Sequence, residues 1–449
     1  MVTDLTVEHP KKTLWKFMFP MFISVMFQQF YNIADSIIAG HFAGEAALAA
    51  VGASYPVTVV FMAFAVGSNL GTSVLVSALF GGKQYKRMKS AISTAFVFCT
   101  VLSIVLTFTG IIFCDPVLIL VKTPLDILNV SALYLKIYVF GIVFLIFYNV
   151  STGIFTALGD SRTPLYFLIG SSVFNIVLDY IFVAVFSLGV EGVAWATFIA
   201  QGISALLAFF TLIKRLKIFK VDGDYEKFDT YLLGQIVKVA VPSILQQSVL
   251  SVGSMFVQEI VNELGSGVVA GFSAAVKLNT FAVNSFMSIG GCLSGYTAQN
   301  IGAGKGNRIP LGFKEGLKMS FVMSLSFFLI YFLGGKYIVR LFLPGGSYMA
   351  VKTCMDFFKI VSPWYFMISV KLMTDGVIRG AGKMIYFVVA TIPDLILRIV
   401  FAKILIQIFG STGIWLAWPF GWIATTVLTI IFYRNIVKEY KNVEDIMTL

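Results

Sequence analysis

The sequence predicts an all-α integral membrane protein with twelve transmembrane helices in two pseudo-symmetric six-helix lobes. Three observations support this fold class. The chain of 449 residues is 58% hydrophobic and only 12% charged, whereas soluble domains average about 25% charged residues. Its apolar residues are gathered in segments of about 20 residues or more, the length at which a helix crosses a bilayer. Finally, the second half of the chain is similar to the first.

Twelve segments are long and apolar enough to span a membrane. In chain order they cover residues 14–39, 50–79, 91–114, 128–157, 163–186, 190–213, 233–261, 268–300, 315–335, 354–378, 384–407 and 411–433. Several of them are interrupted by glycine, so their ends are defined only to within a few residues.

Lysine and arginine are distributed unevenly over the loops between these segments. The two termini and the loops on their side of the membrane carry 21 of the 33 basic residues, and the loops on the opposite side carry 4. Because basic loops remain in the cytoplasm, we predict a multi-pass protein of the cytoplasmic membrane with both termini in the cytoplasm. This distribution accounts for the net charge of +11 without nucleic acid as a partner.

The two halves repeat each other at a nearly constant spacing. Pro20 aligns with Pro242 at a shift of 222 residues, and Gly153 aligns with Gly376 at a shift of 223. Each half has six spans, so both halves enter the membrane in the same direction, as do the parallel repeats of alternating-access transporters. The predicted domains are an N-terminal lobe over 1–213, a charged cytoplasmic linker over 214–232 and a C-terminal lobe over 233–449.

Ionisable side chains inside the spans are costly, so each of them requires a partner or a function. Lys371 and Asp375 have the i,i+4 spacing of an ion pair on one helix, as do Asp394 and Arg398. We expect both pairs to neutralise themselves. Whether they also contact substrate is left open.

Asp35 and Asp179 have no such local partner. Apart from Lys136, the first six spans contain no lysine or arginine well inside the membrane, and Asn175 lies one turn before Asp179. The two carboxylates can be accommodated if they are protonated, share a proton or bind a metal cation. We therefore predict that they couple transport to a cation. The alternative is that they hold helices together by hydrogen bonds.

Glu259 and Lys277 are the remaining charges without a local partner. They either pair with each other or act in the second lobe, where they would contact substrate.

Enzyme motifs are poorly matched. The stretch "TALGDS" at 156–161 is similar to the Gly-x-Gly-Asp of intramembrane aspartyl proteases, but Ala157 occupies the place of the first glycine. We interpret it as a turn in which glycine ends a helix. There is no Gly-x-x-x-x-Gly-Lys-Ser/Thr phosphate loop, so an ion gradient must supply the energy, and we expect no cofactor. The four cysteines and two histidines have no metal-ligand spacing.

Four stretches distributed along the chain resemble the multidrug and toxic compound extrusion (MATE) family. They are "QQFYNIADSIIAGHFAGEAALAAVG" (28–52), "GIFTALGDSRTPL" (153–165), "NIVLDYIF" (175–182) and "GVIRGAGK" (376–383). The resemblance implies two six-helix lobes. It also implies secondary active efflux of organic, often cationic or amphipathic, compounds in exchange for H⁺ or Na⁺.

Within that family the chain resembles the prokaryotic branch with a first-lobe cation site. The resemblance implies a cation-coupling set of Asp35, Asn175, Asp179 and Thr197, with H⁺ or Na⁺ as the coupling ion and any Na⁺ bound at Asp35 and Asp179. It implies supporting roles for Pro20, where the first helix can kink, and for Tyr134. The other branch has a carboxylate on its tenth helix where this sequence has Ile368, which favours the first-lobe site.

The cavity between the lobes is expected to present adaptable apolar and aromatic surfaces to small organic substrates. Met26, Gln28 and Tyr31 are candidate liners, with core packing as the equal alternative. We expect a monomer surrounded by membrane lipid. One rival is a related flippase for lipid-linked precursors or a dedicated metabolite exporter, although Arg398 is the one mid-span arginine available to a flippase. A membrane-embedded enzyme is a further rival, but no catalytic set is evident.

Overall fold

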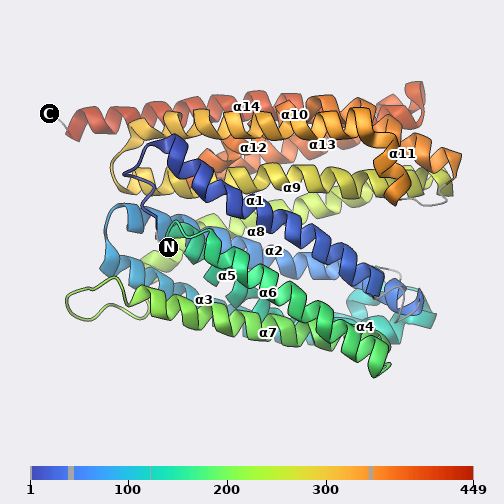
Figure 1. The fold of residues 1–449 in the computed structure, drawn as a ribbon, viewed down its shortest axis with the longest axis horizontal. Helices are drawn as coiled ribbons and strands as arrows, with labels where there is room; N and C mark the ends of the chain where they lie inside the picture. Colours follow the sequence, from blue (N-terminus) through green and yellow to red (C-terminus); the bar gives the residue numbers. More distant parts are fainter. Residues whose placement is uncertain (1–2, 39–44, 122, 343–346, 448–449) are drawn as a thin grey trace. The chain divides into compact units, whose positions relative to one another are not determined.

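The chain is almost entirely helical. The computed structural model describes residues 3–38, 45–121, 123–342 and 347–447, without the side chains of 33–38, 45–48, 252, 341–342 and 442–447. The described residues form helices joined by turns and loops and contain no strand (Figure 1). This observation confirms the predicted all-α fold class.

The helices form two compact units. Unit 1 comprises Met1–Asp4 and Phe19–Ser248, and unit 2 comprises Leu5–Met18 and Val249–Leu449. Two helices therefore contribute to both units: α1 (Pro10–Ile38) and α8 (Thr230–Asn262). The loop between α7 (Gly189–Leu216) and α8, where we predicted the linker, lies within unit 1.

Unit 1 contains the helices of the first half of the chain. Besides parts of α1 and α8 and the whole of α7, these are α2 (Glu45–Gly81), α3 (Tyr85–Leu120), α4 (Leu125–Phe140), α5 (Ile142–Ala157), α6 (Arg162–Asp179) and the π-helical turn η2 (Tyr180–Val185). The predicted fourth span, 128–157, is not a single continuous helix. It is divided at Gly141 into α4 and α5, which meet at a bend of 46°.

Unit 2 contains the helices of the second half. They are α9 (Ser266–Gly302), the short η3 (Gly306–Arg308), α10 (Ile309–Phe342), α11 (Tyr348–Val361), the short η4 (Ser362–Trp364), α12 (Tyr365–Gly380), α13 (Met384–Phe409) and α14 (Ser411–Met447). The predicted tenth span, 354–378, is likewise interrupted. Pro363 lies in the break η4 between α11 and α12, and proline lacks the amide hydrogen that a continuous helix would use.

The apolar helices match the predicted spans. Among the described residues, nine helices are long and apolar enough to cross a membrane, or ten if the bent pair α4–α5 counts as one span. The other two predicted spans correspond to α1 and to the run α11–η4–α12. α1 carries Lys16 and two glutamines, and α12 carries Lys371, Asp375 and Arg379, so these two helices are more polar than the rest.

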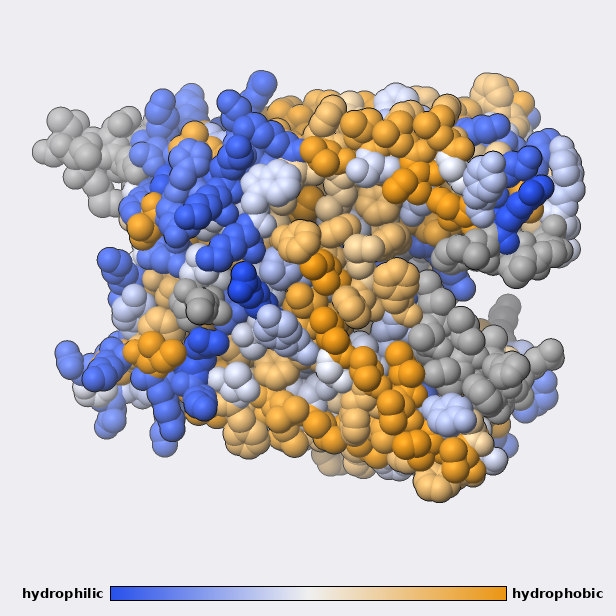
Figure 2. All heavy atoms as spheres, in the orientation of Figure 1, coloured by the Kyte–Doolittle hydropathy of each residue, from blue (hydrophilic) through white to orange (hydrophobic). Residues whose placement is uncertain are grey.

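The surface of each unit has the distribution expected of a membrane protein. Figure 2 shows mostly apolar residues along the sides of the helices and hydrophilic residues at the helix ends. Large side chains such as Phe108, Phe210 and Leu333 are more than 60% exposed. Such exposure of large apolar side chains is favourable in lipid and unfavourable in water.

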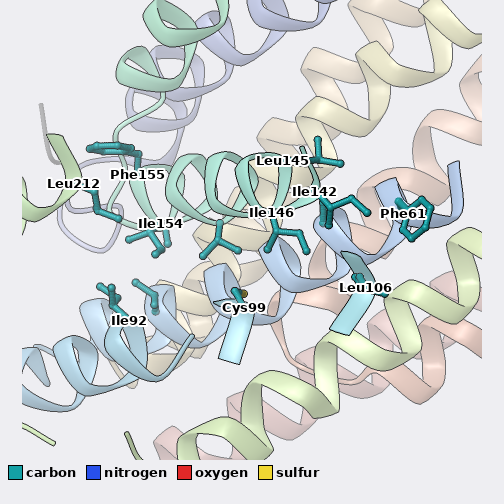
Figure 3. Close-up of a cluster of buried hydrophobic side chains, with 14 of the residues drawn as sticks. Phe61, Ile92, Cys99, Leu106, Ile142, Leu145, Ile146, Ile154, Phe155 and Leu212 are labelled. Carbon is teal, nitrogen blue, oxygen red and sulfur yellow. The ribbon is translucent and has the colours of Figure 1, made fainter. Parts of the chain in front are cut away.

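The core of unit 1 lies where α2, α3 and α5 meet. Figure 3 shows Cys99 and Leu106 of α3 pointing toward Ile142 and Ile146 of α5, with Phe61 of α2 beside them. These side chains are at most 9% exposed. The cluster fixes α5, and thereby the loop that leads into α6.

The segment before α1 is bound to unit 2 through its backbone. Leu5 is fully buried, and its amide donates a hydrogen bond to Oε1 of Gln299 (2.9 Å). Nη2 of Arg308 donates to the carbonyl of Glu8 (2.6 Å), and Nζ of Lys305 donates to that of Thr6 (3.0 Å). Basic side chains of η3 and the preceding turn thus bind this segment by its carbonyl groups, which holds the start of α1 in place.

Glycines permit the closest helix contacts in both units, and the repeat provides a matched comparison between them. A Cβ at Gly376 on α12 would collide with the carbonyl oxygen of Gly290 on α9, which is backbone and cannot move alone. A Cβ at Gly153, its counterpart on α5, would meet the side-chain amide of Asn69 on α2, which can rotate away.

We therefore expect Gly376→Ala to lower the free energy of unfolding by about 1–3 kcal/mol, the usual cost of overpacking, and Gly153→Ala to lower it less. Thermal unfolding of the two purified variants in detergent measures the difference. A larger loss in Gly153→Ala would contradict the assignment of the tighter backbone contact to α9 and α12.

Candidate cation site

Two of the predicted site residues lie on α6 in unit 1. Asn175 is 3% exposed and Asp179 is 1% exposed. Asp179 is the last residue of α6, and the helix continues directly into the π-helical turn η2. Single π-helical turns inside α-helices are frequent at functional sites. The change of helix type therefore begins at the buried carboxylate.

α1 reaches this position through Tyr31. The Tyr31 hydroxyl donates a hydrogen bond of 2.5 Å to Oδ1 of Asn175. Asp35 lies one turn further along α1, and its side chain is outside the described residues. Tyr31, predicted as a candidate cavity liner, thus contacts a member of the predicted site.

Thr197 and Tyr134 come together in a second part of unit 1. Both line a small pocket that is bounded by α4 and α7, and it includes Gly141, at which α4 ends and α5 begins. Tyr134 also packs against the cluster formed by Val183 of η2 and Val193 of α7. The structure therefore brings Tyr31 to Asn175 and Tyr134 to Thr197, both within unit 1.

Pro20 lies inside α1 and is buried. It has no amide hydrogen, so the helix lacks one backbone hydrogen bond there. The Ser24 hydroxyl donates to the Pro20 carbonyl at 2.9 Å. Of the other candidate liners on α1, Met26 is half-buried and Gln28 is exposed. A kink linked to protonation remains a prediction.

Lys136, the exception among the first six spans, has a partner that the sequence analysis did not identify. Its Nζ lies 3.0 Å from Oδ2 of Asp115, and both side chains are partly exposed, at 41% and 55%. Asp115 lies just beyond the predicted third span, 91–114, whereas α3 continues to Leu120. A longer third span would have brought Asp115 inside the membrane and marked it as a second charge that needs a partner.

Both predicted ion pairs of the second half are present. Nζ of Lys371 lies 2.7 Å from Oδ2 of Asp375, and Nη2 of Arg398 lies 2.6 Å from Oδ2 of Asp394. All four side chains are at most 15% exposed. The i,i+4 spacing was therefore sufficient to predict them.

Glu259 and Lys277 are both exposed, on α8 and α9. In the part of the chain that the structure describes, no ion pair joins them. Their contact with substrate remains a prediction. Ile368, which occupies the place of the other branch's carboxylate, is buried in α12.

The "TALGDS" stretch forms a helix-ending turn, as predicted. Gly159 has a φ of +74° just after α5. The buried Asp160 accepts hydrogen bonds from the amide and the hydroxyl of Thr163 (3.1 and 2.9 Å) at the start of α6. It also lies 3.2 Å from Nη2 of Arg215. The carboxylate is thus used to begin a helix and to pair with a cation, which are structural roles.

An all-α membrane protein with an internal repeat and a buried carboxylate beside an amide has the architecture of a secondary transporter. The chain matches the MatE family over residues 20–181 and 242–404. The starts of these two matches are 222 residues apart and their ends 223, which is the repeat found in the sequence. The protein belongs to the multidrug and toxic compound extrusion (MATE) family.

Two curated relatives and one solved structure illustrate the similarity. The chain is 30% identical over 433 residues to the probable multidrug resistance protein YpnP of Bacillus subtilis, with 96% of each chain covered. It is 23% identical over 319 residues to an FAD transporter of Shewanella oneidensis, covering 70% of this chain and 68% of that one.

The solved structure is a MATE-family multidrug resistance transporter in an outward-facing conformation. It superposes with a TM-score of 0.92 at 22% identity, and 98% of this chain and 99% of that chain are covered. This likeness confirms the predicted fold of twelve helices in two lobes.

Proposed function

We propose that the protein is a secondary active exporter of organic, often cationic or amphipathic, compounds, driven by the inward flow of H⁺ or Na⁺. Membership of the MATE family and the similarity to a probable multidrug resistance protein support export. The observation that carries the proposal is the buried Asp179, which lies on the same face of α6 as Asn175. Asn175 in turn accepts a hydrogen bond from Tyr31 of α1.

The coupling group in this proposal consists of Asp35, Asn175, Asp179 and Thr197. Tyr31 brings α1 to α6 one turn before Asp35, and a carboxylate at membrane depth is favoured only when a proton or cation neutralises it. Carboxylate, amide and hydroxyl oxygens suit Na⁺ as well as H⁺. A cation that binds to α6 would therefore alter contacts with α1.

The location and orientation that we propose for the protein follow from its composition and the distribution of its charges. The protein is embedded in a membrane, which we propose is the cytoplasmic membrane with both termini in the cytoplasm, because of the distribution of basic residues. We propose a monomer in contact with lipid that handles small organic molecules. The coupling ion takes the place of a cofactor, and no enzymatic step is required.

A dedicated metabolite exporter is the second candidate, and the similarity to an FAD transporter favours it over a flippase. A flippase for polyprenyl phosphates would need unpaired arginines. The mid-span Arg398 is paired with Asp394, which argues against that role.

Transport by purified protein in liposomes tests the proposal. We expect ethidium to be driven across the membrane by an imposed pH gradient or an imposed Na⁺ gradient, and Asp179→Asn to abolish that movement. FAD serves as the second probe. Gradient-driven transport of FAD without ethidium would support the metabolite exporter, whereas failure of both gradients to move either probe would contradict ion-coupled export.

A further inference from the structure

The internal repeat assigns second-lobe counterparts to two residues of the predicted cation site. α6 with η2 covers Arg162–Val185, and α13 covers Met384–Phe409. The two family matches end within these helices, at 181 and 404, a shift of 223. At this shift Asn175 corresponds to Arg398. The second half therefore has a permanent cation where the first half has a neutral amide of the predicted site.

The next helix of each half extends the comparison. Gly189 is the first residue of α7, and Gly410 directly precedes α14. The two glycines have nearly the same positive φ, +57° and +58°. Aligning these two glycines gives a shift of 221 residues, at which Thr197 corresponds to Trp418. The counterparts of two predicted cation-site residues are thus an arginine and a tryptophan.

These counterparts contact each other in unit 2. The guanidinium carbon of Arg398 lies 4.3 Å from the ring centre of Trp418, a cation–π contact. Nη2 of Arg398 lies 2.6 Å from Oδ2 of Asp394, whose side chain is 8% exposed. The absence of a side chain at Gly421 on α14 leaves room for Asp394, because a Cβ there would collide with Oδ1. In this cluster the buried carboxylate of Asp394 is paired with a cation, the guanidinium of Arg398, that is part of the protein itself.

We propose that Arg398 is a tethered cation that permanently occupies the second-lobe counterpart of the cation site, so that Asp394 does not exchange H⁺ or Na⁺. A guanidinium remains charged under all physiological conditions. A carboxylate that it neutralises therefore has no need of a second cation. The inference rests on the proposed function for the first-lobe site. It adds that ion exchange is confined to that lobe.

Without Arg398, Asp394 would have the capacity to hold a free cation. Oδ1 of Asp394 is buried and has no hydrogen-bond partner among the described residues. Arg398 is the charged group that pairs with Asp394, and α14 presents Trp418 and Gly421 to the pair, neither of which titrates. Replacing Arg398 with the asparagine of the first lobe should leave both carboxylate oxygens to a proton or Na⁺.

Infrared difference spectra of the purified full chain test the inference by counting the carboxylic acids that gain a proton between alkaline and acidic buffer, with and without Na⁺. The wild type and the double variant Asp394→Asn/Arg398→Asn should give the same count, because Asp394 does not exchange. Arg398→Asn alone should gain one acid band. The double variant identifies this band as Asp394. Arg398→Lys, which keeps the charge, should not gain it.

Two results would overturn the inference. One is a band that is present in the wild type and lost in the double variant, because Asp394 would then exchange a proton in the native protein. The other is a folded Arg398→Asn variant with no additional band. If that variant does not fold, the comparison of wild type with the double variant still decides the matter. Asp179→Asn is measured alongside: failure to lose a band there would count against the proposed first-lobe site and leave the Asp394 comparison intact.

Discussion

Asp179→Asn is expected to reduce the drug resistance that the protein confers on a pump-deficient host to the level of the empty host, because ionisable residues at membrane depth mark ion pathways. The side chain is 1% exposed, at the point where α6 changes to the π-helical turn η2. Asparagine has nearly the same shape but cannot take up a proton or balance Na⁺. The packing should survive, and coupling should be lost. Asp35→Asn is expected to have the same effect.

Resistance is measured from growth in the presence of ethidium, and membrane-inserted protein is measured from the same cells. Asp222→Asn is the matched control, because Asp222 lies exposed in the loop between α7 and α8. It should retain full resistance. Full resistance in Asp179→Asn at normal expression would remove this carboxylate from the mechanism.

Asp375→Asn is expected to destabilise the protein more than Lys371→Met. Lys371, Asp375 and Arg379 follow one another at i,i+4 spacing on α12 and are all at most 7% exposed. Asp375 is the one anion between two buried cations. Its removal leaves both cations without compensation, and breaking a buried pair in this way typically costs about 3–5 kcal/mol.

Loss of Lys371 leaves Asp375 with Arg379 one turn further on, so part of the compensation remains. Arg379 also lies over the ring of Phe387, 5.4 Å from its centre. Unfolding midpoints of the purified variants in detergent report the order of stability. The double variant Lys371→Met/Asp375→Asn should lose less than the sum of the two single changes. Equal losses for the two single variants would show that Arg379 does not compensate Asp375.

The sequence was sufficient for the fold class and for local pairs of charges. Apolar segments of bilayer length predict helices because every backbone polar group in lipid must be satisfied within the segment. The i,i+4 spacing of Asp394 and Arg398 fixes their approach, since helix geometry alone brings such residues together. These features depend on neighbours in the sequence.

Features that depend on packing were not predicted. The break at Gly141 lies in a continuous apolar segment, because glycine is compatible with a helix and bends it only where neighbours require it. The π-helical turn after Asp179 has no characteristic amino-acid composition by which the sequence could reveal it. Lys136 and Asp115 lie on different helices, so their approach depends on how α3 and α4 pack. Within the site, the contact between Tyr31 and Asn175 is of this kind.

The exchange of segments between the two units has a consequence for how the protein is made. Leu5–Met18 belongs to unit 2, and Leu5 bonds to Gln299, so during synthesis this segment must wait for residues almost three hundred positions later. Unit 1, in turn, is completed only when the chain has been synthesised as far as Ser248. A gene fragment ending at residue 213 would therefore not encode a finished lobe. Biogenesis must delay the final docking of Leu5–Met18 until the second half has been inserted.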